Sequence, residues 1–235
     1  MDSITLRQTQ VQVRINSFVR SVYNWMAIGL AITGFTAYAV ANSPEVQRVI
    51  FGSGIVFFGL IIAQLALVFM ISGRIHKMQA ATATSLFIVY SALNGATLSA
   101  IFLAYAASTI TSTFFVCSAT FVACSIYGYT TRRDLTSMGG FLTMGLIGIV
   151  IASLINMFFQ SGAVSTIISY IGVLVFVGLT AYDTQDIKNM ALAQPDDIDA
   201  GAVRKGAILG ALKLYLDFIN LFLMLLRIFG SSREE

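Results

Sequence analysis

The chain has 235 residues, of which 57% are hydrophobic and 11% are charged, and its formal net charge is +3. Soluble domains carry about 25% charged residues, so this composition excludes a soluble globular protein and predicts one membrane domain. The small positive charge, with no basic cluster interleaved with aromatic residues, also excludes a nucleic-acid-binding protein.

The segment 1–20 is polar and precedes a full-length apolar segment. It lacks the short apolar core and the small-residue cleavage site of a secretory signal. We therefore expect residues 1–20 to remain as a cytoplasmic tail that forms an amphipathic helix on the membrane surface.

Charges divide the rest of the chain into apolar segments. Four uncharged runs lie at 21–44 (24 residues), 49–73 (25), 78–131 (54) and 135–182 (48). A final apolar segment follows at 206–230. About 20 residues cross the hydrocarbon core as a helix, so each long run predicts two helices and each other segment predicts one. The sequence therefore predicts seven helices within 21–230 and a short C-terminal tail at 231–235.

The two long runs are expected to turn near "LAYAAST" (103–109) and "FFQSGAV" (158–164). The alternation of apolar and polar residues that marks a membrane barrel is absent from the sequence. Backbone groups in lipid must find partners within their own segment, so helices remain. Small residues spaced for close helix packing recur at 94–100, 138–148 and 206–210. The expected fold class is an all-α membrane protein with seven transmembrane helices.

Lys and Arg are divided unequally between the two sides of the membrane. With the N-terminus inside, ten basic residues lie on the inner side and three on the outer side. The positive-inside rule then places the N-terminus in the cytoplasm and, after seven spans, the C-terminus outside. The inner residues are Arg7, Arg14, Arg20, Arg74, Lys77, Arg132, Arg133, Lys188, Arg204 and Lys205, and the outer residues are Arg48, Arg227 and Arg233.

Side chains typical of enzymes and metal sites are scarce. Cys117 and Cys124 are seven residues apart on one predicted helix, roughly 10 Å, which is too far for a disulfide. His76 lies in an interfacial loop, and no zinc spacing, phosphate-binding loop or hydrolase motif occurs. The acidic loop 194–201 departs from the EF-hand pattern, and we expect it to be solvated, with acids that cap a helix. We expect no enzyme activity and no bound cofactor.

Two carboxylates in the last two predicted helices are the candidates for function. Asp183 lies in "AYDTQDI" toward the inner end of the sixth helix, and Asp217 lies in "KLYLDFIN" near the middle of the seventh. A carboxylate at that depth costs about 2.5–3.5 kcal/mol on insertion scales, so it should face the bundle interior or a water path. If the two meet, they share a proton and form a pH switch, and the ionised pair attracts hard cations such as Ca²⁺ transiently.

A structural role for this cluster stays open. Lys213 precedes Asp217 by one helical turn and is placed to pair with it, and Asn220 follows three residues later. Asp186 shares a face with Asp183 but is expected to be solvated near the interface. In the earlier helices, Gln64 is expected to hydrogen-bond across to a neighbouring helix, an interaction worth about 0.6–2 kcal/mol.

The stretches "VYNWMAIGLAITGFTAYAVANSP", "SGRIHKM", "AYDTQDI" and "LYLDFINLFLMLLRIFG" resemble the bacterial branch of the Bax inhibitor-1 (TMBIM) family. The resemblance covers nearly the whole chain from residue 20. It implies six helices wrapped around a central C-terminal helix, in a protein of the bacterial inner (cell) membrane. It also implies that Asp183 and Asp217 form a di-aspartyl pH sensor in a Ca²⁺ leak and that Arg74 latches the pore closed. Gln64 stands where many relatives carry an acid, so the chain departs from the family pattern there.

Two functions follow from these patterns. The first is a pH-sensitive leak channel for cations, Ca²⁺ being the expected ion, gated by the pair Asp183 and Asp217. The alternative is a regulatory protein that binds a membrane-bound ATP-dependent protease, as the family resemblance implies for some bacterial members. A retinal-binding protein is disfavoured, because the chain has one tryptophan, Trp25, and the acid of the last helix follows Lys213 instead of preceding it.

Overall fold

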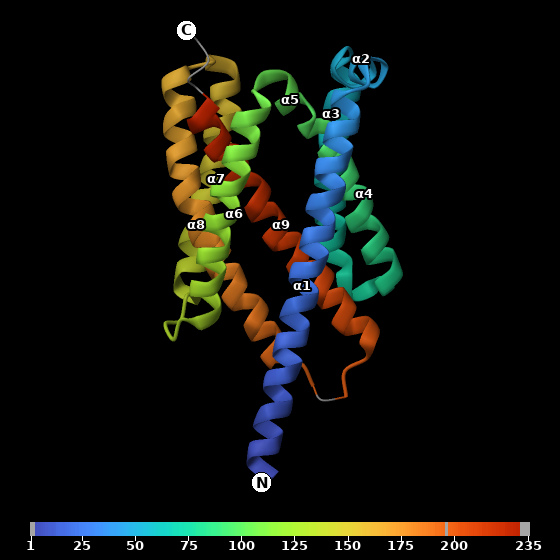
Figure 1. The fold of residues 1–235 in the computed structure, drawn as a ribbon, viewed down its shortest axis with the longest axis vertical. Coiled ribbons are helices and arrows are strands. Elements are labelled where there is room, and N and C mark those ends of the chain that lie inside the picture. The colour runs from blue at the N-terminus through green and yellow to red at the C-terminus, as the bar shows by residue number, and fades with distance from the viewer. Residues whose placement is uncertain (1–2, 196, 231–235) are drawn as a thin grey trace. The chain divides into compact units, whose positions relative to one another are not determined.

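The computed structural model describes residues 3–195 and 197–230, with side chains from residue 9 onward, and over this range it contains helices and loops but no strand (Figure 1). Seven helices are long and apolar enough to cross a membrane. This confirms the predicted all-α fold class with seven transmembrane helices. The predicted tail 231–235 lies outside the described residues. The seven long helices are α1 (Ser3–Ala41), α3 (Gly54–Arg74), α4 (Ala80–Leu98), α6 (Ala107–Thr130), α7 (Thr136–Phe159), α8 (Gly162–Leu192) and α9 (Ala200–Gly230).

Three short helices join the long ones. They are α2 (Pro44–Phe51), η1 (Ile75–Lys77) and α5 (Ala100–Ala104). Proline at the start of α2 fits the first turn of a helix, where its missing N–H is not needed. The turns predicted in the two long uncharged runs are confirmed, since α5 ends at Ala104 and α7 ends at Phe159.

Helix α1 passes through residue 20 without a break. It is a single helix of 39 residues, about 58 Å long at 1.5 Å per residue. Ile15, Phe18 and Val22 are buried and lie on one face, because their spacing follows the helical period. From residue 3, the segment predicted to lie on the membrane surface is therefore the first part of the first long helix.

The turn between α7 and α8 is held by an asparagine. The Asn156 side chain donates to the Ser161 carbonyl at 3.2 Å and accepts from the Ser161 N–H at 3.1 Å. Gln160 ends α7 in the left-handed conformation, with φ 49°. The side chain thus supplies the polar partners that the last turn of a helix otherwise lacks.

The chain divides into two compact units, each described by itself. Unit 1 comprises α1 to α5, the chain from Asn189 through the end of α8, and α9 up to Tyr215. Unit 2 comprises Tyr105–Lys188, which includes α6, α7 and most of α8, and α9 from Leu216. The last helix therefore contributes its first half to one unit and its second half to the other.

In unit 1, α1 packs closely on α4 and both pack on α9. A Cβ at Gly95 would collide with the Thr33 carbonyl oxygen, so glycine permits this close approach. The hydroxyls of Thr33 and Tyr215 lie 2.6 Å apart, and Thr33 also reaches the Ser91 carbonyl at 2.9 Å. The Tyr215 ring packs edge-on against Phe87, with centroids 5.9 Å apart.

In unit 2, α6 packs closely on α8, and a Cβ at Gly128 would collide with the Ala181 carbonyl oxygen. Phe218 of α9 packs edge-on against Phe121 of α6, with ring centroids 5.4 Å apart. The Cys117 thiol donates to the Phe218 carbonyl at 3.7 Å. Cys117 therefore acts in packing, as expected for an isolated cysteine in an apolar span.

Helix α9 is the most buried of the seven long helices. In its most apolar window 72% of residues are buried, against 6–33% in the other six. Helices α1 and α4 pack on its first half in unit 1, and α6 and α8 pack on its second half in unit 2. This confirms the prediction of a central C-terminal helix.

Candidate functional site

Asp217 is a buried carboxyl group in the second half of α9. Its side chain is 5% exposed, and it is the one charged residue among the buried polar residues of the described chain. Leu214 and Leu221, one turn before and one turn after it, are fully buried. Burying an acid in a membrane helix costs free energy, because its ionised form leaves water.

Asp183 lies half-buried on α8, in the same unit as Asp217. Thr180 and Ile187, three residues before it and four residues after it, are fully buried. Residues at these spacings share one face of a helix, so Asp183 belongs to the packed face of α8.

The two aspartates lie on the same side of a close contact between α8 and α9. A Cβ at Gly172 would meet the Met224 side chain at 2.8 Å, so the two helices pack tightly there. The helices run in opposite directions because a short loop joins them. At 1.5 Å per residue, Asp183 lies about 16 Å from Gly172 along α8, and Asp217 lies about 10 Å from Met224 along α9. The distances of the two aspartates from the helix contact therefore differ by roughly one helical turn.

Two neighbours of Asp183 anchor α8 to the last turn of α6 and to the loop between α6 and α7. The Gln185 amide accepts the Leu135 N–H at 2.8 Å and donates to the Arg133 carbonyl at 2.9 Å. Lys188 donates to the Tyr129 carbonyl at 2.8 Å, and its ammonium lies 5.1 Å from the centre of the Tyr129 ring. Sequence reasoning missed these positioning roles, because the groups that accept or donate the hydrogen bonds are backbone atoms, which the sequence does not reveal.

Asn220 and Asp186 have less distinctive surroundings. Asn220 is half-buried, and its amide donates to the Leu216 carbonyl of its own helix at 2.8 Å. Asp186 is half-buried on α8.

Among the described residues, no group of three or more His, Cys, Asp or Glu side chains is arranged to hold a metal ion. Asp183 and Asp217 would therefore offer a cation two carboxylates, which suits transient contact better than a stable site.

The other predicted residues belong to unit 1. Arg74 ends α3 in an exposed position and, with Lys77, lines a cavity of about 440 Å³. Lys213 is half-buried on α9. The Gln64 amide donates to Thr97 of α4 at 3.3 Å, which is the cross-helix hydrogen bond expected of it. Because Arg74 and the two aspartates belong to different units, the predicted latch stays a prediction.

The acidic loop before α9 supplies a helix cap, as expected. A carboxylate oxygen of Asp199 accepts the Ala202 N–H at 3.2 Å. At the same end of α9, Arg204 stacks over the Trp25 ring at 5.4 Å and donates to the Thr84 hydroxyl at 3.1 Å. These contacts fix the first turns of α9 within unit 1.

Comparison with known proteins finds a match over most of the chain. Residues 15–234 match the family described as "Inhibitor of apoptosis-promoting Bax1". The inner membrane protein YbhL of Escherichia coli K12 is 53% identical over 235 residues, which cover 99% of this chain and 100% of that protein. An uncharacterized protein of Borreliella burgdorferi is 46% identical, with 99% of this chain and 100% of that protein covered. An uncharacterized protein of Deinococcus radiodurans is 41% identical, with 100% and 98% covered.

Proposed function

This chain belongs to the Bax inhibitor-1 family, and from that premise we propose that it is a pH-sensitive cation leak channel of the inner membrane. Ca²⁺ is the expected ion, because hard divalent cations prefer carboxylate and carbonyl oxygens. The observation that carries the proposal is the buried acid Asp217, at 5% exposure in the most buried of seven membrane helices. Such a costly residue calls for a role beyond packing.

Asp183 is the proposed partner of Asp217. Both acids lie in unit 2, on two helices that pack tightly at Gly172 and Met224, and on the same side of that contact. Two carboxyl groups in a poorly hydrated site share one proton, because ionising both would place like charges together. In the closed state, the pair holds one proton, and a hydrogen bond between the two carboxyl groups joins α8 to α9.

Loss of that proton opens the path. The two carboxylates then repel each other, and their negative charge attracts a cation between the helices. The leak is therefore expected to rise with pH. A switch that releases one proton changes its population by up to about tenfold per pH unit. Arg74 is proposed to stabilise the closed state through its positive charge.

The decisive experiment measures Ca²⁺ flux into proteoliposomes over a range of pH. Asp217→Asn and Asp183→Asn each remove the shared proton site while keeping the side-chain shape. We expect each variant to have low flux and to lose the pH dependence, with a fall of about tenfold at the pH where the wild type is most active. Asp186→Asn, three residues from Asp183 on the same helix, is the matched control and should keep the wild-type profile.

Equal flux at every pH in wild type and both variants would contradict gating by the aspartate pair. That result, together with co-purification of a membrane protease, would favour the regulatory alternative. If the flux keeps its pH dependence in Asp217→Asn but loses it in Asp186→Asn, the pH sensor includes Asp186 and not Asp217, and the proposed pair is wrong.

A further inference from the structure

Two buried hydroxyl groups of α6 have no hydrogen-bond partner among the residues that the structure describes. They belong to Thr113, which is fully buried, and to Ser125, which is 8% exposed. Serine and threonine in a helix usually bond to the carbonyl four residues back, as Ser118 and Thr120 do on the same helix at 2.8 and 2.9 Å. A buried hydroxyl without a partner is unfavourable, so each of these two groups calls for a bound polar molecule.

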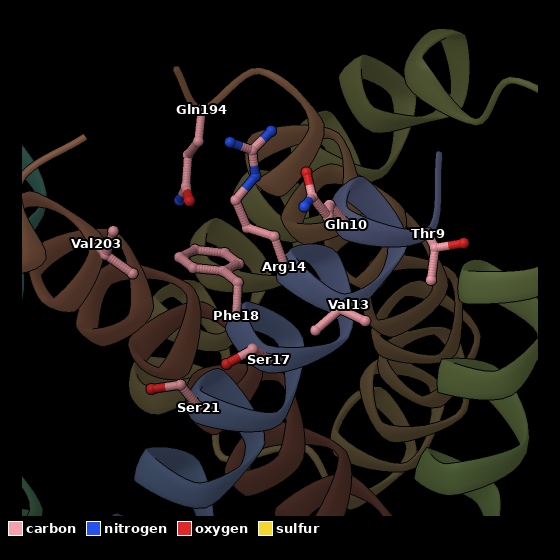
Figure 2. A pocket seen from close by; sticks show the side chains of 9 residues that line it. All are labelled: Thr9, Gln10, Val13, Arg14, Ser17, Phe18, Ser21, Gln194 and Val203. Carbon is pink, nitrogen blue, oxygen red and sulfur yellow. The ribbon is translucent and has the colours of Figure 1, made fainter. Parts of the chain in front are cut away.

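The surroundings of Ser125 differ from those of Gln194 in unit 1, whose Oε1 atom also has no partner within the described part of the chain. Gln194 lines a cavity of about 540 Å³ beside the first part of α1, and Figure 2 shows its side chain near Arg14 and Phe18. Most of the α1 residues that line this cavity precede the uncharged segment, so solvent outside the membrane reaches it. Ser125 lies within a membrane span, about 8 Å from the end of α6, so the protein itself must hold its polar partner there.

Ser125 lies next to the contact between α6 and the part of α9 that carries Asp217. One turn before Ser125, the Phe121 ring packs edge-on against Phe218, the residue that follows Asp217 in the chain. Thr113 lies on the other side of this ring contact, about 18 Å from Ser125 along α6. Of the two hydroxyls, Ser125 is therefore the one on the inner side of the rings.

Ser125 also lies next to the contact between α6 and the part of α8 that carries Asp183. Gly128, three residues after Ser125, packs so closely on α8 that a Cβ there would collide with the Ala181 carbonyl oxygen. Ala181 precedes Asp183 by two residues. Residues three and four apart share one face of a helix, so Ser125 lies on the face of α6 that packs against both α8 and α9.

We propose that Ser125 binds a water molecule that belongs to the aspartate site, and that the hydroxyl and this water add oxygen ligands for a cation that passes Asp183 and Asp217. This inference rests on the proposed function. Ca²⁺ takes about 6–8 oxygen ligands, whereas two carboxylates supply at most about four. A hydroxyl and a water add oxygens without adding charge, so the cation is solvated and still leaves readily.

Cysteine reactivity in lipid nanodiscs tests whether water reaches position 125. In the full-length protein with Cys117 and Cys124 replaced by alanine, Ser125→Cys keeps nearly the size and shape of the side chain. A thiol reacts with methanethiosulfonate reagents as the thiolate, which forms readily only where its charge is solvated. We expect a small cationic methanethiosulfonate to modify Ser125→Cys about tenfold faster than Ile126→Cys, as measured by intact mass.

Ile126→Cys is the matched control for depth in the membrane. Ile126 is the next residue of α6, and its side chain is 59% exposed on the surface of the span, where lipid surrounds it. Equal rates at the two positions, whether slow or fast, would overturn the water site, because the reaction would then not depend on the packed face of α6.

Ser125→Ala tests the contribution to the cation path in the Ca²⁺ flux assay. It removes only the hydroxyl, and we expect the flux at the pH where the wild type is most active to fall about fivefold, which corresponds to about 1 kcal/mol. Ser118→Ala removes a hydroxyl that bonds to its own helix and should leave the flux unchanged. An unchanged flux in Ser125→Ala, or an equal fall in both variants, would overturn the role in the cation path.

The two measurements separate this inference from the proposed function. If the wild type carries no Ca²⁺ flux but Ser125→Cys reacts faster than Ile126→Cys, the channel and the cation ligand are wrong, whereas the bound water stands. If the wild type shows a pH-dependent flux but the two cysteine variants react equally, the channel stands and the water site is wrong.

Discussion

At the scale of single residues, Tyr215 and Asp217 show two uses of a buried polar group. They are two residues apart on α9, which places them on nearly opposite sides of the helix. Tyr215 has a defined neutral partner, the Thr33 hydroxyl at 2.6 Å. Asp217 can change its charge, and its burial makes that change costly. The first residue therefore stabilises unit 1, whereas the second is the residue for which we propose a response to pH.

The Tyr215 hydroxyl can be removed alone. Tyr215→Phe keeps the ring contacts with Phe87 and Tyr90 but breaks the bond to Thr33. We expect a loss of about 1 kcal/mol, or a Tm lower by about 2–4 °C for a chain of this size. Thermal unfolding in detergent measures it. Thr33→Val and the double variant complete a cycle, and strictly additive effects would show that the bond contributes nothing.

Asp134 gives a pH dependence outside the membrane spans. Hydrogen bonds from the Thr136 side chain and backbone N–H lower the pKa of Asp134, which caps the start of α7. A lowered folded-state pKa stabilises the fold above the unfolded value, about 3.9, and this stability is lost as pH falls through the folded pKa. Asp134→Ala should therefore lower Tm at neutral pH, and the difference from wild type should narrow below about pH 4. A difference that is constant with pH would contradict the ionic cap.

At the scale of helices, charge spacing predicted the seven spans and both internal turns. Charge spacing did not predict that α1 would continue through residue 20. Polar and charged residues lie between Ile15, Phe18 and Val22 in the sequence, so the apolar face that these three residues form is not visible as an apolar run. Burial of Asp217 followed from its place in the last span. The anchoring of Asp183 by Gln185 could not be foreseen, because it depends on backbone groups of a distant loop.

Close packing of α6 on α8 can be tested with two glycines. Gly128→Ala would bring a Cβ against the Ala181 carbonyl, and we expect it to destabilise unit 2 by about 1–3 kcal/mol. Gly148→Ala is the matched control, because a Cβ there meets nothing within 4 Å and alanine favours the helix. Thermal unfolding should show a lower Tm for the first variant only. Equal Tm values would contradict the close approach.

At the scale of the whole molecule, the seven spans and the positive-inside rule predict that successive loops lie on opposite sides of the membrane. Asn42 follows α1 and Asp197 lies between α8 and α9, and both are exposed. In a background without Cys117 and Cys124, a membrane-impermeant thiol reagent added to intact cells should label Asn42→Cys but not Asp197→Cys. Labelling should reverse in inside-out vesicles, and labelling of both variants in intact cells would refute the topology.

The division of α9 between the two units has a consequence for biosynthesis. Each unit takes one half of the last long helix into its packed interior, with Tyr215 packing in unit 1 and Phe218 packing in unit 2. During translation, six spans enter the bilayer before the helix that completes either unit has left the ribosome. Neither core can close early, so a nascent chain halted before α9 should remain an open, protease-sensitive set of helices. Helix α9 is thus synthesised last, and the six earlier membrane helices reach their native packing only after it has been inserted.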